Sequence, residues 1–131
     1  MKLLGKIFDK HNQPKEISLR DDLTSSLAHA THIFKAKAYK ALDENSARLL
    51  SKAFSYQCED VMRYLDLLKE SADYDIQISN IEFKINFLAY VDETVNMEFA
   101  SRESVALALQ EGDRLLENFK YYITIRTIRN E

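Results

Sequence analysis

Apolar residues return every three to four positions along four stretches of the chain, a spacing typical of helices that bury one face. These stretches are residues 18–42, 43–68, 79–99 and 101–128. Four helices of similar length with short connections predict an all-α fold, an antiparallel up-and-down four-helix bundle. The side chains expected to face inward are Leu23, Leu27, Ala30, Phe34, Ala38 and Ala41 in the first helix; Leu50, Phe54, Val61, Leu65 and Leu68 in the second; Ile81, Ile85, Leu88 and Val95 in the third; and Val105, Leu109, Gly112, Leu116, Phe119 and Ile123 in the fourth.

The expected helix starts carry short polar side chains, which can accept hydrogen bonds from free backbone N–H groups. Ser18 has an acidic residue three positions later, and the sequence DEN at 43–45 is typical of a break followed by a new cap. The sequence S-N-I-E from Ser79 fits a capping box, with Ile78 placed to pack on Phe83. We therefore expect the third helix to begin at Ser79.

Two segments conflict with the helical pattern. The sequences IEFKINF (81–87) and YYITIRTI (121–128) alternate with period two and are rich in β-branched and aromatic residues, which is typical of strands. We prefer helices because a capping box precedes the first segment, neither segment is separated from the helical pattern by a turn, and an isolated strand pair is marginally stable. The alternative is an α+β fold with a strand pair at 81–90 and 120–128.

As a helix, the third segment has two apolar faces. Ile81, Ile85 and Leu88 lie on the side that we expect to face the core. The aromatic residues Phe83, Phe87 and Tyr90 lie on the other side. The fourth helix repeats this arrangement at its carboxyl end, which antiparallel packing places beside the start of the third helix. The two surplus faces then form one apolar patch that another surface should cover. The expected interface consists of Phe83, Phe87, Tyr90, Tyr121, Ile125 and Ile128.

Residues 1–16 are expected to form an amino-terminal arm ahead of a single helical-bundle domain at 17–131. The arm carries a short amphipathic stripe of Leu3, Leu4, Ile7 and Phe8, with lysines beside it. The bundle topology places the arm at the same end as the patch, so it could cover the patch of its own chain or that of a neighbour. The stripe is too short for a secretory signal or a transmembrane helix.

Composition points to one intracellular domain. The chain has 131 residues, 46% hydrophobic and 30% charged, which suffices for one buried core. The single cysteine, Cys58, can form no internal disulfide, so we expect a cytoplasmic protein. The net charge of −3 is not the basic footprint of a nucleic-acid-binding protein. The first 42 residues hold eight basic and four acidic residues, whereas residues 43–100 hold five and twelve.

Two histidines, His29 and His32, stand three residues apart on the outer side of the first helix. They could bind one metal ion, but a metal site needs three or four protein ligands and no others are evident, so we expect neither metal nor cofactor. Lys35 and Ala36 follow His32 at the third and fourth positions. This segment resembles the His-x-x-Lys-Gly segment of histidine phosphotransfer domains, with alanine at the glycine position. The resemblance implies that His32 accepts a phosphoryl group and that Lys35 balances its charge.

The same outer face also fits a contact between subunits. Small and aromatic side chains allow helices to approach closely, and this makes the face a second possible interface. Ordinary solvated helix surface is an equally good interpretation. The residues concerned are Ala28, His29, His32, Ala36 and Tyr39.

One polar residue, Gln57, stands in line with Phe54 and Val61 on the second helix. Buried in the bundle it could fix the helix register, as polar residues do in coiled coils. We expect it instead at the bundle edge, in water.

The sequence contains no Ser-His-Asp ordering and no glycine-rich phosphate loop, so we expect a non-enzymatic protein without a small-molecule substrate. The leading interpretation is a protein–protein interaction or assembly module, a small helical adaptor or regulator that associates with another copy of itself. Neither nucleic acid nor membrane is an expected partner. The alternative is a histidine phosphotransfer-like signalling domain that uses His32.

Overall fold

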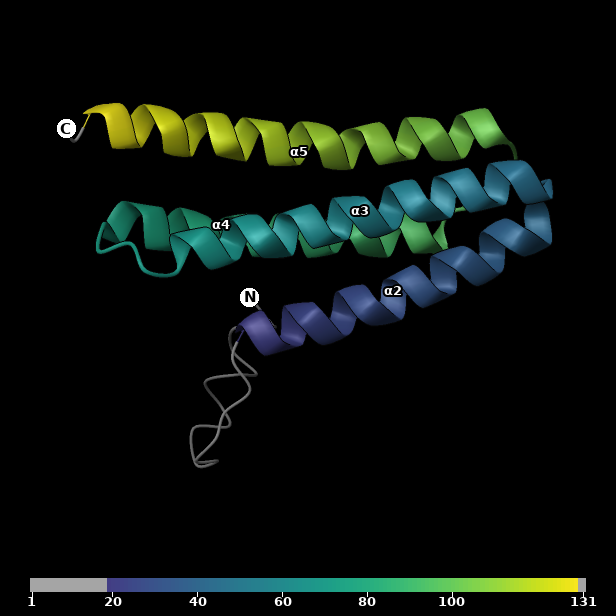
Figure 1. Cartoon of the computed structure of the whole chain (residues 1–131), viewed down its shortest axis with the longest axis horizontal. Coiled ribbons are helices and arrows are strands. Elements are labelled where there is room, and N and C mark those ends of the chain that lie inside the picture. Colours follow the sequence, from purple (N-terminus) through teal and green to yellow (C-terminus); the bar gives the residue numbers. More distant parts are fainter. Residues whose placement is uncertain (1–18, 130–131) are drawn as a thin grey trace.

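A computed structural model describes residues 19–129, with side-chain surroundings described from Leu23 onward. Its four helices alternate in direction along the bundle (Figure 1). The predicted up-and-down four-helix bundle is confirmed. The alternative strand pair at 81–90 and 120–128 is wrong, because the described residues contain no strand. The helices are α2 (Leu19–Ala41), α3 (Glu44–Leu68), α4 (Tyr74–Asn96) and α5 (Arg102–Arg129).

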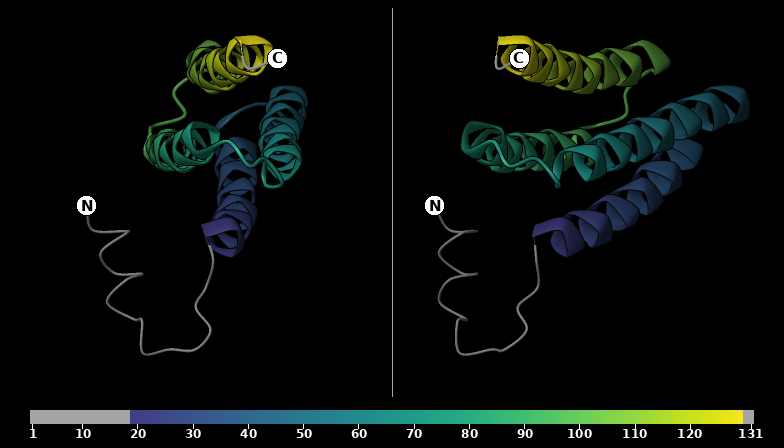
Figure 2. Two further views of the ribbon diagram at one scale, coloured as in Figure 1. Left: turned by 90° about the vertical axis from the view of Figure 1, so that its left-hand side faces the viewer. Right: turned by 60° about the vertical axis from the view of Figure 1, so that its left-hand side comes forward.

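In cross-section, α3 and α4 lie side by side between the two outer helices, α2 and α5 (Figure 2). Each outer helix contacts both inner ones, whereas α2 and α5 do not contact each other within the described residues. Because α2 and α4 run in the same direction, both begin at the end of the bundle where α5 finishes (Figure 1). That shared end carries most of the surfaces considered below.

The inner faces of α2 and α5 agree with the sequence pattern. All six predicted α5 positions are buried, and so are the predicted α2 positions except Ala41, which is exposed in the last turn. In the middle of the core the Phe34 ring stacks on Phe54 at 4.6 Å between centroids and meets the edge of Phe99 at 5.0 Å. Aromatic side chains bury large areas, so this cluster contributes strongly to stability.

The predicted facing of α4 is reversed except at Val95, which is buried as expected. Phe83, Phe87 and Tyr90 lie in the core, at 6%, 0% and 6% exposure, and the Phe83 ring stacks on Phe119 at 4.4 Å. The isoleucine side that was expected to face inward is only partly buried. With two apolar faces, the period of the pattern cannot select one, and the larger, stacking aromatic rings take the core. These three residues therefore cannot contribute to a surface interface in this fold.

The start of α4 also differs from the prediction. The helix begins directly after Asp73, whose carboxylate accepts hydrogen bonds from the backbone N–H groups of Asp75 at 2.9 Å and Ile76 at 3.4 Å. Asp73 thus satisfies the free N–H groups of the first turn. Ser79 lies inside the helix rather than at its cap, and Ile78 is 38% exposed rather than packed on the core.

Two other predicted starts are confirmed, and the predicted cap Ser18 lies outside the described residues. Asp43 caps α3 by accepting a hydrogen bond from the Ser46 N–H at 3.1 Å. Ahead of α5, the Ser101 and Ser104 hydroxyls each accept a hydrogen bond from the other residue's backbone N–H, at 3.1 and 3.2 Å. This reciprocal arrangement is a capping box with serine in place of the usual Glu or Gln.

The carboxyl end of α4 is capped from another helix. The Lys37 ammonium on α2 donates hydrogen bonds to the carbonyl oxygens of Val95 at 2.7 Å and Met97 at 2.6 Å. It also lies 4.8 Å from the centre of the Phe99 ring. Carbonyls at a helix end lack partners within the helix, and a cation suits the negative end of the helix dipole. Lys37 therefore joins the ends of two parallel helices.

Candidate interaction surfaces

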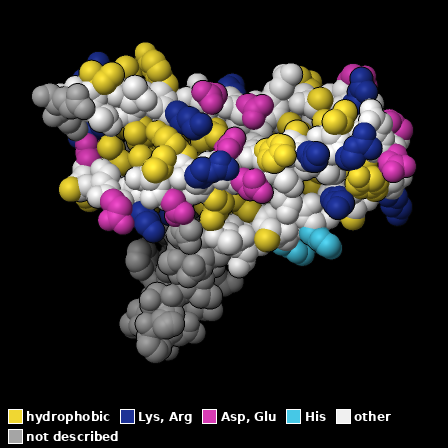
Figure 3. Space-filling model, in the orientation of Figure 1, with side chains coloured by type: hydrophobic (Ala, Val, Ile, Leu, Met, Phe, Trp, Pro, Cys, Tyr) yellow, Lys and Arg dark blue, Asp and Glu magenta, His cyan; other side chains and the backbone are white. Residues whose placement is uncertain are grey.

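Three large apolar side chains stand out from the ends of α3 and α5. Leu67, Tyr121 and Ile128 are 72%, 69% and 60% exposed. We call them the α3/α5 patch. Figure 3 shows hydrophobic side chains gathered in the left half of the molecule, below α5, with charged side chains around them. A soluble protein seldom leaves neighbouring bulky apolar side chains in water without a use for them.

Contacts between α3 and α5 fix the level of Leu67 along the bundle. The Tyr64 ring of α3 meets the edge of Phe119 at 5.9 Å, and the Lys120 ammonium lies 5.5 Å from the Tyr64 ring centre. The two helices run in the same direction, so the turn after Tyr64 lies beside the turn after Lys120. Leu67 therefore lies level with the last turns of α5.

The structure keeps only part of the predicted six-residue interface at the surface. Tyr121 and Ile128 are exposed as expected and Ile125 is partly exposed, but the three aromatic residues of α4 are in the core. Leu67 of α3 is also exposed at this end of the bundle, and the sequence did not point to it. The only signal was that Leu67 is bulky and falls off the buried face defined by Leu65 and Leu68.

The second predicted interface lies on the outer face of α2. All of its members are exposed, and so is Lys35. The histidines drawn in Figure 3 lie at the lower edge of the molecule, away from α3 and α5. The face is therefore accessible to a partner along its length. Its members are Ala28, His29, His32, Ala36 and Tyr39.

The part of the chain that the structure describes has no group of side chains suited to metal binding or to thiol chemistry. Residues 19–129 contain no group of three or more His, Cys, Asp or Glu side chains placed to hold a metal ion. Cys58 is buried, and this desolvation raises the pKa of its thiol to about 12. A thiol reacts through its thiolate form, so Cys58 is inert at neutral pH.

Two grooves run between helices. One, of about 430 Å³ between α2 and α3, has Leu27, Cys58 and Met62 among its lining residues. The other, of about 480 Å³ between α4 and α5, has Asn86 and Tyr122 among its lining residues. Both open along the surface. Their shape suits side chains of a partner better than an enclosed small molecule.

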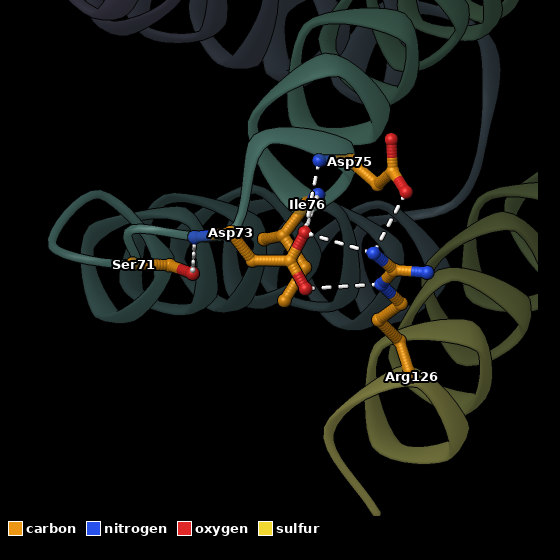
Figure 4. A network of polar contacts seen from close by, with 5 residues as sticks. All are labelled: Ser71, Asp73, Asp75, Ile76 and Arg126. Carbon is orange, nitrogen blue, oxygen red and sulfur yellow. Dashed lines mark hydrogen bonds and ion pairs between the residues drawn. The ribbon is translucent and has the colours of Figure 1, made fainter. Parts of the chain in front are cut away.

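An ion-pair cluster joins the start of α4 to the end of α5 (Figure 4). The Arg126 guanidinium donates to both carboxylate oxygens of Asp73, at 2.9 and 3.3 Å, and lies 2.7 Å from the Asp75 carboxylate. The hydrogen bond from Arg126, together with those from the backbone N–H groups, lowers the pKa of Asp73. The same contact raises the pKa of Arg126. The cluster confirms that the start of the third helix lies beside the end of the fourth.

A polar network crosses the core between α3, α4 and α5. The Gln57 amide donates to the Leu109 carbonyl and to the Asp113 carboxylate, both at 2.9 Å, and its oxygen accepts a 2.5 Å hydrogen bond from the Tyr90 hydroxyl. Gln57 is 5% exposed, so its expected place at the bundle edge is wrong. Gly112 makes room for the network, because a Cβ atom there would overlap Gln57 and Tyr90.

Comparison of the chain with known family models, curated protein sequences and solved structures gave no match. None of the helices in residues 19–129 has the length and apolarity needed to cross a membrane. The predicted arm, residues 1–16, lies outside the described residues, and its boundary with the bundle stays a prediction.

Proposed function

We propose that this protein is a non-catalytic assembly module that associates with a second copy of itself through the α3/α5 patch. The observation that carries the proposal is the exposure of Leu67, Tyr121 and Ile128 at one end of the bundle. Covering these side chains removes apolar area from water, which is the main favourable term in protein association. A two-fold dimer would place the same patch of both subunits in contact.

The charges around the patch support a second copy as the occupant. On α3, Arg63 lies 3.3 Å from Asp60, and on α5, Lys120 lies 4.0 Å from Glu117. Each of these four charges is thus accompanied by one of opposite sign. Such a rim selects neither a strongly acidic nor a strongly basic partner, whereas it can be complementary to itself.

The test is the oligomeric state of the full chain in solution. Sedimentation at high micromolar concentration should give a dimer or larger assembly for the wild type. The double variant Leu67→Lys and Tyr121→Lys should be monomeric with an unchanged helical circular dichroism spectrum, because both side chains lie outside the core. Leu107→Lys is the matched control, since Leu107 is 66% exposed near the other end of α5. A monomeric wild type, or equal weakening by the control, would overturn the proposal.

A second candidate function is phosphotransfer at His32. The observation favouring it is that His32, Lys35 and the flanking alanines Ala28 and Ala36 are all exposed on the outer face of α2. A response-regulator receiver domain would approach this face. The His32 imidazole nitrogen would attack the phosphorus of the regulator's aspartyl phosphate, forming a P–N bond as the P–O bond breaks and returning a free aspartate carboxylate.

Phosphotransfer is tested by incubating the chain with a phosphorylated receiver domain and measuring acid-labile phosphate on it. Transfer to the wild type and none to His32→Gln would support this candidate. His29→Gln is the matched control, because His29 lies one turn away on the same exposed face. Absence of transfer, or equal transfer to His32→Gln, would eliminate it.

A further inference from the structure

The reversal of α4 leaves an apolar strip on its outer side. Ile78 is 38% exposed, and Ile81, Ile85 and Leu88 are partly exposed, with Leu88 also packed against the core. These four residues, which we call the α4 strip, follow one another at spacings of three and four, so they line one side of the helix. The strip is separate from the α3/α5 patch, because all four of its residues lie on α4.

The strip lies next to the amino-terminal half of α2. A small cavity of about 110 Å³ lies where α2, α3 and α4 meet, and it is lined by Leu23 of α2, by Met62, Leu65, Asp66 and Lys69 at the end of α3, and by Gln77, Asn80 and Lys84 of α4. Ile81 stands four residues after Gln77 and three before Lys84, so it belongs to the same flank of α4. Since the helices are parallel, the start of α2, one turn before Leu23, lies level with the first turns of α4.

The segment that precedes α2 has the length and chemistry to cover this strip. Residues 1–16 contain the apolar stripe Leu3, Leu4, Ile7 and Phe8. Residues 9–18 lie between that stripe and α2, and ten residues can span about 30 Å. The whole strip is only about 15 Å long, at 1.5 Å per helical residue. The tether is therefore long enough without strain.

The opposite net charges of residues 1–16 and of α4 are a second reason to expect contact between them. The lysines at 2, 6, 10 and 15 outnumber the two acidic residues of residues 1–16. On α4, Asp75, Glu82, Asp92 and Glu93 outnumber the single basic residue. Glu82 is exposed next to Ile81, and Asp92 is exposed one turn after Leu88, in line with the strip. A basic amphipathic segment matches the net negative charge of α4.

We infer that residues 1–16 of the chain pack in cis over the α4 strip, with the Leu3–Phe8 stripe against Ile81 and Ile85. Attachment at the start of α2 holds the segment close to its own strip at a high effective concentration, which favours the strip of the same chain over that of another. The segment thereby covers apolar surface that the bundle leaves open.

The test uses a nitroxide spin label attached to Asp9→Cys in the full chain. If the nitroxide lies close to the strip, it should remove more than half of the methyl NMR intensity of Ile81 and Ile85. The methyl signals of Leu107, at the opposite end of the bundle, should keep their intensity. The unsubstituted chain treated with the same label is the blank, because Cys58 is buried and should not react.

Two further samples decide how the segment packs. A mixture of spin-labelled chain without isotopes and isotope-labelled chain without spin label should show no loss, because the contact is within one molecule. Adding Ile7→Asp and Phe8→Asp to the spin-labelled chain should restore the Ile81 and Ile85 signals. Full intensity in the first experiment, loss in the mixed sample, or no recovery in the double variant would each overturn the inference. None of these outcomes depends on the α3/α5 patch.

Discussion

At the scale of single residues, the buried Gln57 network shows how a polar side chain fits a bundle core. Its amide and oxygen both find partners, so burial leaves neither group unpaired. The Tyr90 hydroxyl is satisfied by the same residue, and burial raises the pKa of Tyr90. A bond set that joins three helices is formed only in one register, so the network selects the native alignment over slipped ones.

Gly112→Ala should destabilise the protein by about 1–3 kcal/mol, the usual cost of overpacking a core. The added Cβ would overlap both Gln57 and Tyr90, so one of the two must move. Urea unfolding followed by circular dichroism measures the effect. In a Tyr90→Leu background the same substitution should cost less, because one overlapping group is gone. If Gly112→Ala instead stabilised the protein, as alanine does at an open helix position, the close approach would be refuted.

At the scale of the helix, sequence and structure agree where one signal dominates. The starts of α3 and α5 were predictable because a break in the helical pattern lies at Asp43 and at Ser101, and both side chains can cap a helix. The start of α4 was not, because both Asp73 and Ser79 have capping side chains. Asp73 has the additional contact with Arg126, fifty-three positions later in the chain. No local pattern could reveal that partner.

Lys37→Met should destabilise the protein by about 1–2 kcal/mol, because two carbonyls at the end of α4 lose a charged donor. Methionine keeps much of the aliphatic stem, so the loss of packing is small. Hydrogen exchange should accelerate mainly in the last turn of α4, alongside a lower urea midpoint. Lys35→Met, two residues earlier and exposed, is the matched control and should change stability by less than about 0.5 kcal/mol. Equal effects of the two substitutions would contradict the cap.

At the scale of the whole molecule, the bundle was predictable from periodicity, and the surface was not. Helix number, order and direction follow from four amphipathic stretches with short connections. Which face of α4 is buried depends on how Phe83 stacks on Phe119, a contact between helices. A side chain is exposed only if it is not used in such contacts between helices. A wrong predicted orientation of one helix therefore changes which residues are expected at the interface. Thus Tyr121 and Ile128 are exposed as predicted, whereas the α4 aromatics are buried and the exposed Leu67 was not predicted.

The Asp73–Arg126 pair should make the stability of the whole bundle depend on pH in acid. The pKa of Asp73 is lower in the folded than in the unfolded chain, chiefly because of the hydrogen bond from Arg126. Its contribution is therefore complete above the ordinary aspartate pKa of about 4 and is lost as pH falls through the lowered folded-state value. Arg126→Gln should be less stable than the wild type at pH 7.

That difference between wild type and Arg126→Gln should shrink as the pH falls below about 4, because protonated Asp73 no longer distinguishes the two side chains. Urea midpoints measured from neutral pH into this acid range give the curve. Arg114→Gln is the matched control, since Arg114 pairs with Glu111 within one exposed turn of α5 and lowers the pKa of Glu111 in the same way. Removing that pair should change stability less, because it holds no second helix in place. A gap between wild type and Arg126→Gln that stayed constant with pH would show that Arg126 acts by packing rather than by its charge on Asp73.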